Sequence, residues 1–138
     1  MTQAVELRHA DAEECRAGGL TPDEALEQSK SLSTHWWEIR AEDGTPICWW
    51  GYAAPSLMGL YCNGWMLSTP EADNHKFYIA RQSRFVLANL LRAYPTVQAQ
   101  VDVEHSRAVR WLKWLGFHEV SREGRFALMR ITSRKGLH

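Results

Sequence analysis

The stretch at residues 101–117, VDVEHSRAVRWLKWLGF, limits what this chain can fold into more than any other part of it. At its start, valines alternate with Asp102 and Glu104, which is the pattern of a strand with one buried face. Ser106 is a suitable N-cap for a helix, and the apolar residues that follow recur along one side of that helix. Gly116 stands where a helix end favours a residue with no side chain. The stretch therefore predicts a strand, a turn, an amphipathic helix and a further strand.

Turn and cap residues divide the rest of the chain into short elements. Thr21-Pro22 followed by Glu24 forms a capping box with proline in the first turn, and this predicts the start of a helix. Asp43-Gly44 predicts the tight turn of a hairpin, and Pro95 ends a long helix. The expected elements are, in order, a strand at residues 4–7, helices at 11–18 and 22–31, strands at 34–41, 45–53 and 60–68, a helix at 70–94, the strand and helix within 101–117, and strands at 117–121 and 126–132.

Two pairs of adjacent tryptophans, Trp36-Trp37 and Trp49-Trp50, lie within the expected hairpin. Neighbouring residues of a strand point to opposite faces of a sheet, so burial of both members of a pair requires cover on both faces. Gly64 interrupts the third of these strands and predicts a bulge.

Length and charge narrow the class of protein. At 138 residues the chain is expected to form one domain, residues 1–138, with its own core. Lys plus Arg and Asp plus Glu both number 16, so the net charge is zero and nucleic acid is not expected as the main partner. No apolar run approaches the ~20 residues of a membrane span, and the first residues lack the order of a signal peptide. A soluble protein made in a cytoplasm is expected.

The cysteines and histidines do not predict a metal site. The cysteines, Cys15, Cys48 and Cys62, are odd in number and have no ligand-like spacing, so they are expected as small buried residues in a reducing compartment. The six histidines show no pairing at metal-ligand spacing.

The helix of the opening stretch resembles the fourth-helix signature of the GCN5-related N-acetyltransferase (GNAT) superfamily. Residues 107–109 (RAV) and 115–117 (LGF) match that signature in identity and spacing, whereas His105 replaces its usual Asn and Leu112 its usual Tyr. The expected order of elements also matches that of the superfamily along essentially the whole chain. The resemblance implies an α/β (α+β) fold, with a mixed, mostly antiparallel sheet and helices on both faces.

The resemblance also implies where acetyl-CoA would bind. In this superfamily a glycine-rich loop at the start of the third helix holds the diphosphate on backbone amides. Residues 68–76, STPEADNHK, stand in that place without a glycine, and Glu71 and Asp73 would set negative charge beside a diphosphate. The site is therefore expected to be degenerate, with no cofactor bound. If the chain is active, the cofactor is acetyl-CoA, and the candidate residues that would hold it are Leu67, Ser68, Asn74 and Lys76.

The sequence indicates catalytic residues less clearly than it indicates the place of the cofactor. Asp102, Glu104 and His105 end a strand at the edge of the expected cleft, where one of them could act as a base. The interpretation favoured here is that the two carboxylates are polar residues of a strand and that His105 is a turn residue. Leu112 cannot donate a proton to a leaving thiolate.

Arg107, Arg110 and Trp114 share one face of the fourth helix and predict an interaction surface. Tryptophan and arginine are frequent at protein interfaces, and the zero net charge favours a protein partner over nucleic acid. Packing of Trp114 beneath a neighbouring loop is an equal alternative.

The C-terminal third carries a narrower resemblance. Residues 122–136, REGRFALMRITSRKG, are similar to the close of the small internal virion proteins of short-tailed bacteriophages, which are GNAT-like. The resemblance implies a non-catalytic protein, made in the host cytoplasm, packaged in the virion and ejected with the DNA. Its partners would be other virion proteins or host proteins; the sequence does not give its oligomeric state.

Two functions stay open. The missing glycines and tyrosine favour a non-catalytic interaction protein of a phage virion, and an inhibitor of a host protein would have the same surface. The fold and the region of His105 favour an active N-acetyltransferase that moves an acetyl group from acetyl-CoA to an amine of a protein or small molecule. Binding of acetyl-CoA separates the two.

Overall fold

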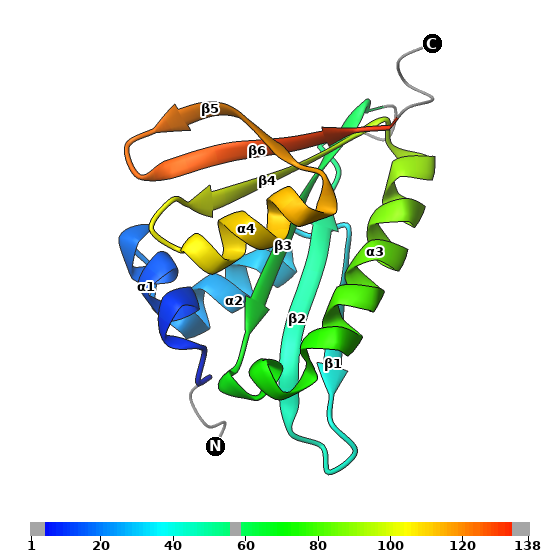
Figure 1. Cartoon of the computed structure of the whole chain (residues 1–138). Coiled ribbons are helices and arrows are strands. Elements are labelled where there is room, and N and C mark those ends of the chain that lie inside the picture. The colour runs from blue at the N-terminus through cyan, green and yellow to red at the C-terminus, as the bar shows by residue number, and fades with distance from the viewer. Residues whose placement is uncertain (1–4, 56–58, 134–138) are drawn as a thin grey trace.

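The computed structural model describes residues 5–55 and 59–133, which form a six-stranded sheet with helices on both faces (Figure 1). The strands are β1 (His35–Arg40), β2 (Pro46–Ala53), β3 (Tyr61–Ser68), β4 (Thr96–Asp102), β5 (His118–Glu123) and β6 (Phe126–Thr132), and the helices are α1 (His9–Ala17), α2 (Pro22–Leu32), the 3-10 helix η1 (Pro70–His75), α3 (Lys76–Ala93) and α4 (Ser106–Leu115). The order across the sheet is β1-β2-β3-β4-β6-β5. β3 and β4 run parallel and the other neighbours antiparallel, so the expected mixed sheet is confirmed. No helix in the described residues is long and apolar enough to cross a membrane.

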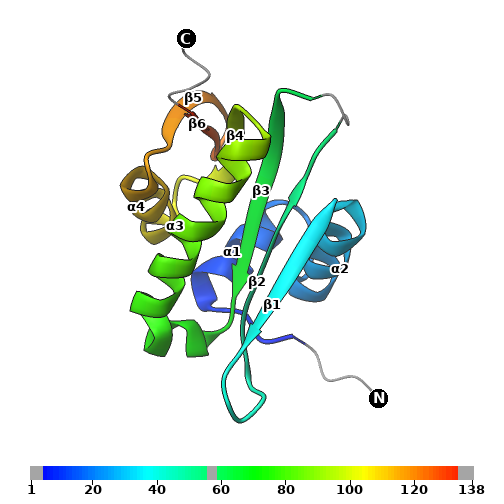
Figure 2. The same ribbon diagram turned by 90° about the vertical axis from the view of Figure 1, so that its right-hand side faces the viewer.

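Helices α1 and α2 cover one face of the sheet, and α3 and α4 cover the other (Figure 2). Trp49 belongs to the apolar cluster under α1 and α2, whereas Trp50 lines a cavity under α3 and α4. Their exposed fractions are 5% and 8%, so β2 is covered on both faces as the tryptophan pair predicts. Trp36 lies on the edge strand β1 and is 40% exposed.

The capping box of α2 and the glycine at the end of α4, both predicted from neighbouring residues, are confirmed. The Thr21 hydroxyl accepts a hydrogen bond from the Glu24 N–H (3.2 Å), and the Glu24 carboxylate accepts one from the Thr21 N–H (3.0 Å), which completes the capping box of α2. Gly116 ends α4 with a φ of 111°, a left-handed conformation that glycine adopts without strain.

The first expected strand does not form. Val5 to Arg8 is irregular, and Ala4 lies outside the described residues. The Arg8 N–H donates to the Ser68 carbonyl (2.8 Å), but the side chain of Asp11 accepts from the Ser68 N–H (2.7 Å). The Asp11 carboxylate therefore occupies the Ser68 N–H, which a paired strand would have used, and residues 5–8 form no ladder with β3.

The long helix begins at Lys76, not at Pro70 as expected. Thr69 still belongs to the sheet, because its N–H donates to the Ile47 carbonyl (2.9 Å) and its hydroxyl to the Pro46 carbonyl (2.8 Å). The chain must then turn sharply away from the sheet, and η1 makes this turn while burying Ala72.

Two further expectations about single residues are wrong. His105, and not Ser106, is the N-cap of α4, since its Nδ1 accepts a hydrogen bond from the Ala108 N–H (3.3 Å). Gly64 makes no bulge against β2, because the β2–β3 register runs unbroken through it.

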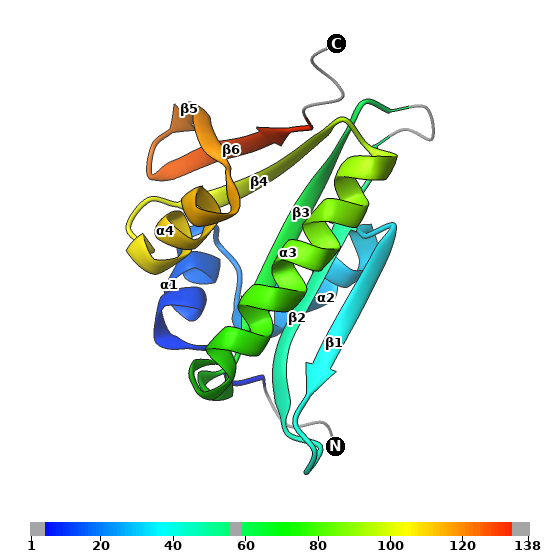
Figure 3. The same ribbon diagram turned by 45° about the vertical axis from the view of Figure 1, so that its right-hand side comes forward.

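The strands β3 and β4 diverge soon after they pair (Figure 3). Their pairing covers Tyr61 to Asn63 on β3 and Thr96 to Gln98 on β4. Beyond it, β3 continues beside β2 and β4 continues beside β6. The sheet therefore opens into a wedge, and Gly64 is the first residue of β3 inside it.

The cysteines are buried and free, as the sequence predicts. Burial raises the pKa of Cys48 to about 12 and that of Cys15 and Cys62 to about 11. These thiols are packing residues with little thiolate character.

Candidate functional site

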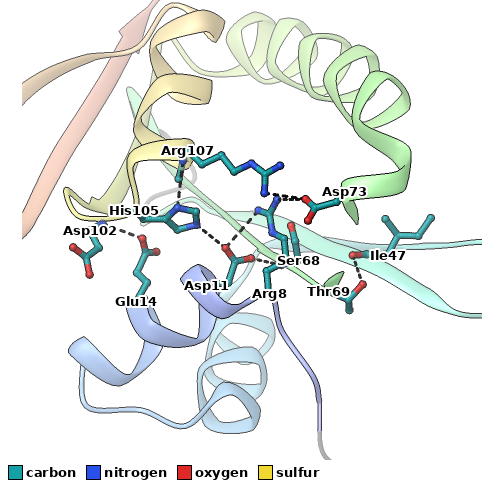
Figure 4. Close-up of polar contacts among 11 residues, drawn as sticks. Arg8, Asp11, Glu14, Ile47, Ser68, Thr69, Asp73, Asp102, His105 and Arg107 are labelled. Atoms are coloured by element: carbon teal, nitrogen blue, oxygen red, sulfur yellow. Dashed lines mark hydrogen bonds and ion pairs between the residues drawn. The ribbon is translucent and has the colours of Figure 1, made fainter. Parts of the chain in front are cut away.

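A cavity of about 600 Å³ lies between α3, α4 and the part of the sheet where β3 and β4 diverge. Most residues that line the cavity are apolar, but charged and polar side chains line one end of it. This polar end comprises Arg8, Asp11, Glu14, Asp73, His105 and Arg107 (Figure 4). These residues come from the start of α1, from η1 and from the start of α4, which meet where the wedge is widest.

The edge of β3 that faces β4 carries backbone groups that no strand of the described chain pairs with. The carbonyl of Leu60 accepts a hydrogen bond from the start of β4 (3.2 Å), and that of Ser68 accepts one from Arg8 (2.8 Å). Hydrogen-bonding direction alternates along a strand, so Gly64 and Met66 also face this edge. In the parallel register of Asn63 with Gln98 the Gly64 N–H belongs to the last bond of the ladder, whereas Met66 lies beyond the pairing. Both residues line the cavity. An extended ligand could pair with this edge as an added strand does.

Asp11 and His105 form a buried pair at the polar end. Their Oδ1 and Nε2 atoms are 2.6 Å apart, and both side chains are nearly inaccessible to solvent. Because His105 Nδ1 accepts from Ala108, the Nε2 proton is the one donated to Asp11. The other carboxylate oxygen of Asp11 accepts from the Ser68 N–H. Asp11 therefore joins α1, β3 and α4, and its contacts are those of a structural residue.

Glu14 lies one helical turn beyond Asp11 and also lines the cavity. Its Oε2 accepts a hydrogen bond from the Asp102 N–H (3.0 Å). Burial raises the pKa of the Glu14 carboxyl above its ordinary value, and the hydrogen bond from Asp102 opposes this only in part. A carboxylate with a raised pKa in a cavity wall is a suitable acceptor for a proton.

Of the three residues expected at the edge of the cleft, only His105 lines the cavity. Asp102 is 1% exposed and accepts hydrogen bonds from Arg125 (2.8 and 2.6 Å) and from the Glu104 N–H (2.9 Å). Burial alone would raise the pKa of Asp102, but these hydrogen bonds hold it below its ordinary value. Glu104 is exposed and pairs with Arg125 (3.0 Å). Asp102 and Glu104 thus fasten the end of β4 to the β5–β6 turn.

The candidate cofactor residues are scattered by the fold. Leu67 is buried under α1 and α2, on the face away from the cavity. Ser68 is fully buried, and its backbone groups are engaged by Arg8 and Asp11. Asn74 donates to Glu71 (3.3 Å). Lys76, the first residue of α3, is the member of the set that lines the cavity.

The expected interaction surface lies at the rim of the same cavity. Arg107, Arg110 and Trp114 all line it. The Arg107 guanidinium is 3.0 Å from Asp73, and Trp114, which is 49% exposed, stacks against the guanidinium of Arg84 on α3 (4.1 Å). These residues bridge α4 to α3 and η1, so they are placed to close the cavity and to contact what enters it.

Sequence reasoning missed Asp11, Glu14 and Arg8. The spacing of Asp11 and Glu14 does put them on one face of α1. Nothing local shows that this face turns toward the end of β4, because their partners are 57, 88 and 94 positions away.

Within residues 5–55 and 59–133, no group of three or more His, Cys, Asp or Glu side chains is placed to hold a metal ion. The polar end can take up a proton at Glu14, whereas its other carboxylates, Asp11 and Asp73, are already paired with Arg8 and Arg107.

Solved structures that are similar to this chain include N-acetyltransferases. The crystal structure of spermidine N-acetyltransferase from Vibrio cholerae in complex with CoA and spermine is similar with a TM-score of 0.63 at 17% identity, over 84% of this chain and 78% of that chain. A proposed phosphinothricin N-acetyltransferase gives a TM-score of 0.58 at 14% identity, over 88% of this chain and 85% of its own. No protein-family model and no curated protein sequence matches the chain. At these identities the likeness is one of fold: the chain has the fold of the GCN5-related N-acetyltransferases.

Proposed function

We propose that the chain is an N-acetyltransferase, which moves an acetyl group from acetyl-CoA to an amine. The observation that carries this proposal is the cavity itself. It opens onto the edge of β3 at Met66, beyond the pairing with β4, and it has a carboxylate of raised pKa, Glu14, in its wall.

The residues present fit acetyl-CoA in part. The backbone edge of β3 at Met66 would hold the extended arm of the cofactor, and the cations Lys76 and Arg110 at the rim would hold its phosphates. The segment 70–75 has no glycine, so a diphosphate would rely more on side chains than on loop amides.

The reaction needs one proton acceptor. The amine nitrogen attacks the acetyl carbonyl carbon, the carbon–sulfur bond breaks, and the sulfur leaves as a thiolate. Glu14 accepts the proton that the amine loses. In the superfamily signature a tyrosine that would protonate the thiolate is replaced here by Leu112. Water must then protonate the thiolate, and we expect a slow enzyme.

The test joins binding and turnover. Acetyl-CoA is titrated into the protein by calorimetry, and release of free thiol is followed with a panel of amines. We expect saturable binding at one site, and a kcat about 100-fold lower in Glu14→Gln with binding of acetyl-CoA unchanged. Glu13→Gln, an exposed neighbour on α1, is the matched control and should retain full activity. No binding at millimolar acetyl-CoA would overturn the proposal.

A non-catalytic binding protein is the second candidate, in the narrower form of an internal virion protein of a short-tailed phage. It is supported by Leu112 in place of a tyrosine, by the acidic segment 70–75, and by Phe77 and Phe85 on α3, which are 87% and 66% exposed. Its partners would be virion or host proteins. A flat acetyl-CoA titration together with capture of such a protein, lost in Phe77→Ser, would favour it over acetyl transfer.

A further inference from the structure

Asp73 lies between two arginines at the mouth of the cavity (Figure 4). Its Oδ1 is 3.5 Å from Nη1 of Arg8 and 3.0 Å from Nη1 of Arg107. Arg8 precedes α1, Asp73 belongs to η1 and Arg107 to α4, so three elements that are distant in sequence meet at one carboxylate oxygen.

The ion pairs of Asp73 with these arginines contribute little to the stability of the fold. The side chains of Asp73 and Arg107 are 44% and 47% exposed, and ion pairs in such positions add little stability. Arg8 is more buried, at 21% exposed, and also contacts Asp11 at 3.4 Å. Its Nε is buried and has no hydrogen-bond partner among the described residues. Arg8 therefore keeps an unused donor beside a loosely held anion.

Two guanidinium groups that converge on an anion are the arrangement that binds phosphate in proteins. We propose that Arg8 and Arg107 form a binding site for a phosphoryl group, and that Asp73 is an internal occupant which a phosphate-bearing ligand displaces. The site does not require acetyl transfer; if the ligand is acetyl-CoA, Asp73 competes with its phosphates and weakens its binding.

The geometry of the cavity favours a ligand with an apolar arm. The arginines stand at the mouth, with Lys76 and Arg110 also on the wall, and the space behind them is mostly apolar. A phosphate ester with an extended organic part would place its charge on the arginines and its arm along the wedge. Release of Asp73 would leave these cations in excess at the mouth.

The first experiment titrates inorganic pyrophosphate by calorimetry at low salt. We expect Asp73→Asn to bind it about tenfold more tightly than the unaltered protein, because the competing carboxylate is gone. Glu71→Gln is the matched control: it removes the same charge from η1, but Glu71 contacts His75 and Asn74 instead of the arginines. The gain should disappear in Asp73→Asn combined with Arg107→Gln. Equal affinities in all variants, or the same gain in Glu71→Gln, would overturn the proposal.

A second pair of titrations identifies the source of the phosphate. With CoA, Asp73→Asn should lower the dissociation constant by about the same factor of ten, whereas pantetheine, which lacks phosphate, should bind both proteins equally. An equal gain with pantetheine would mean that Asp73 acts through shape, and it would contradict the phosphate site. Tighter pyrophosphate binding without any binding of acetyl-CoA would support the anion site while the proposed acetyl transfer fails. Thermal melts of each variant establish that it is folded.

Discussion

The Glu14 carboxyl is partly buried, so its ionisation lowers the stability of the folded state. Its pKa in the folded protein is raised above the ordinary value of 4.5, chiefly by burial. The folded state therefore holds the proton to a higher pH than the unfolded chain does. Between those two pKa values stability falls as the pH rises, and above the folded pKa the loss is complete.

Glu14→Gln should accordingly raise the melting temperature by a few degrees at neutral pH. The amide oxygen can still accept the hydrogen bond from the Asp102 N–H, while the cost of a buried charge is removed. Melts of both proteins from pH 4 to pH 8 should show the difference shrinking to nothing below about pH 4.5, where both side chains are neutral. A difference that stays constant with pH would show that packing, and not ionisation, is responsible.

At the scale of elements, the end of α4 is held by two constraints on one residue. Gly116 has a φ of 111°, and a Cβ built on it would lie 2.9 Å from Cδ1 of Ile131 on β6. Gly44, in the β1–β2 turn, has a similar φ of 90° but open space around it. Comparing the two glycines therefore separates the cost of backbone strain from the cost of a steric clash.

Gly116→Ala should cost about 2 kcal/mol of unfolding free energy, and Gly44→Ala about 1 kcal/mol, because only the first adds a steric clash to the strain. Urea unfolding measures both. Measured in the background of Ile131→Val, which removes the clashing methyl group, Gly116→Ala should cost about as much as Gly44→Ala. If the two glycines are equally costly from the start, β6 does not limit the position of α4.

The same scale shows what could be predicted from the sequence. The capping box of α2, the Gly116 end of α4 and the β1–β2 turn follow from residues a few positions apart, and their cap and turn residues are enough to predict them. The break between η1 and α3 does not follow, because Thr69 is held by carbonyls more than twenty positions upstream. The polar end of the cavity is hidden for the same reason: Glu14 and Asp11 matter only once α1 has docked.

At the scale of the whole molecule, α3 is loosely seated on the sheet. Of its side chains only Ile79 and Ser83 are buried, and the cavity lies between it and the sheet. β4 and β6, in contrast, pair along their entire lengths and hold the core residues Val101 and Met129. Regions with few buried contacts open at lower free energy than the core does.

Hydrogen exchange should therefore be faster by about tenfold or more in the amides of α3 than in those of β4 and β6. Mass spectrometry of peptides covering residues 76–93, 96–102 and 126–132 measures this. A ligand that fills the cavity should slow exchange in α3 and leave the strands unchanged. Equal protection throughout would mean that α3 opens only with the whole domain.

The buried cysteines give the molecule its own reporter of such opening. Cys48 and Cys62 are 0% exposed and Cys15 is 8% exposed, and each carries a thiol whose raised pKa keeps it protonated. A thiol reagent should thus modify the native protein only during excursions that uncover a sulfur, with Cys15 on the short α1 reacting first. Rapid modification of Cys48 in the native state would contradict this order. The modification rate of each thiol then measures how often the surrounding part of the fold opens, and no residue has to be introduced as a probe.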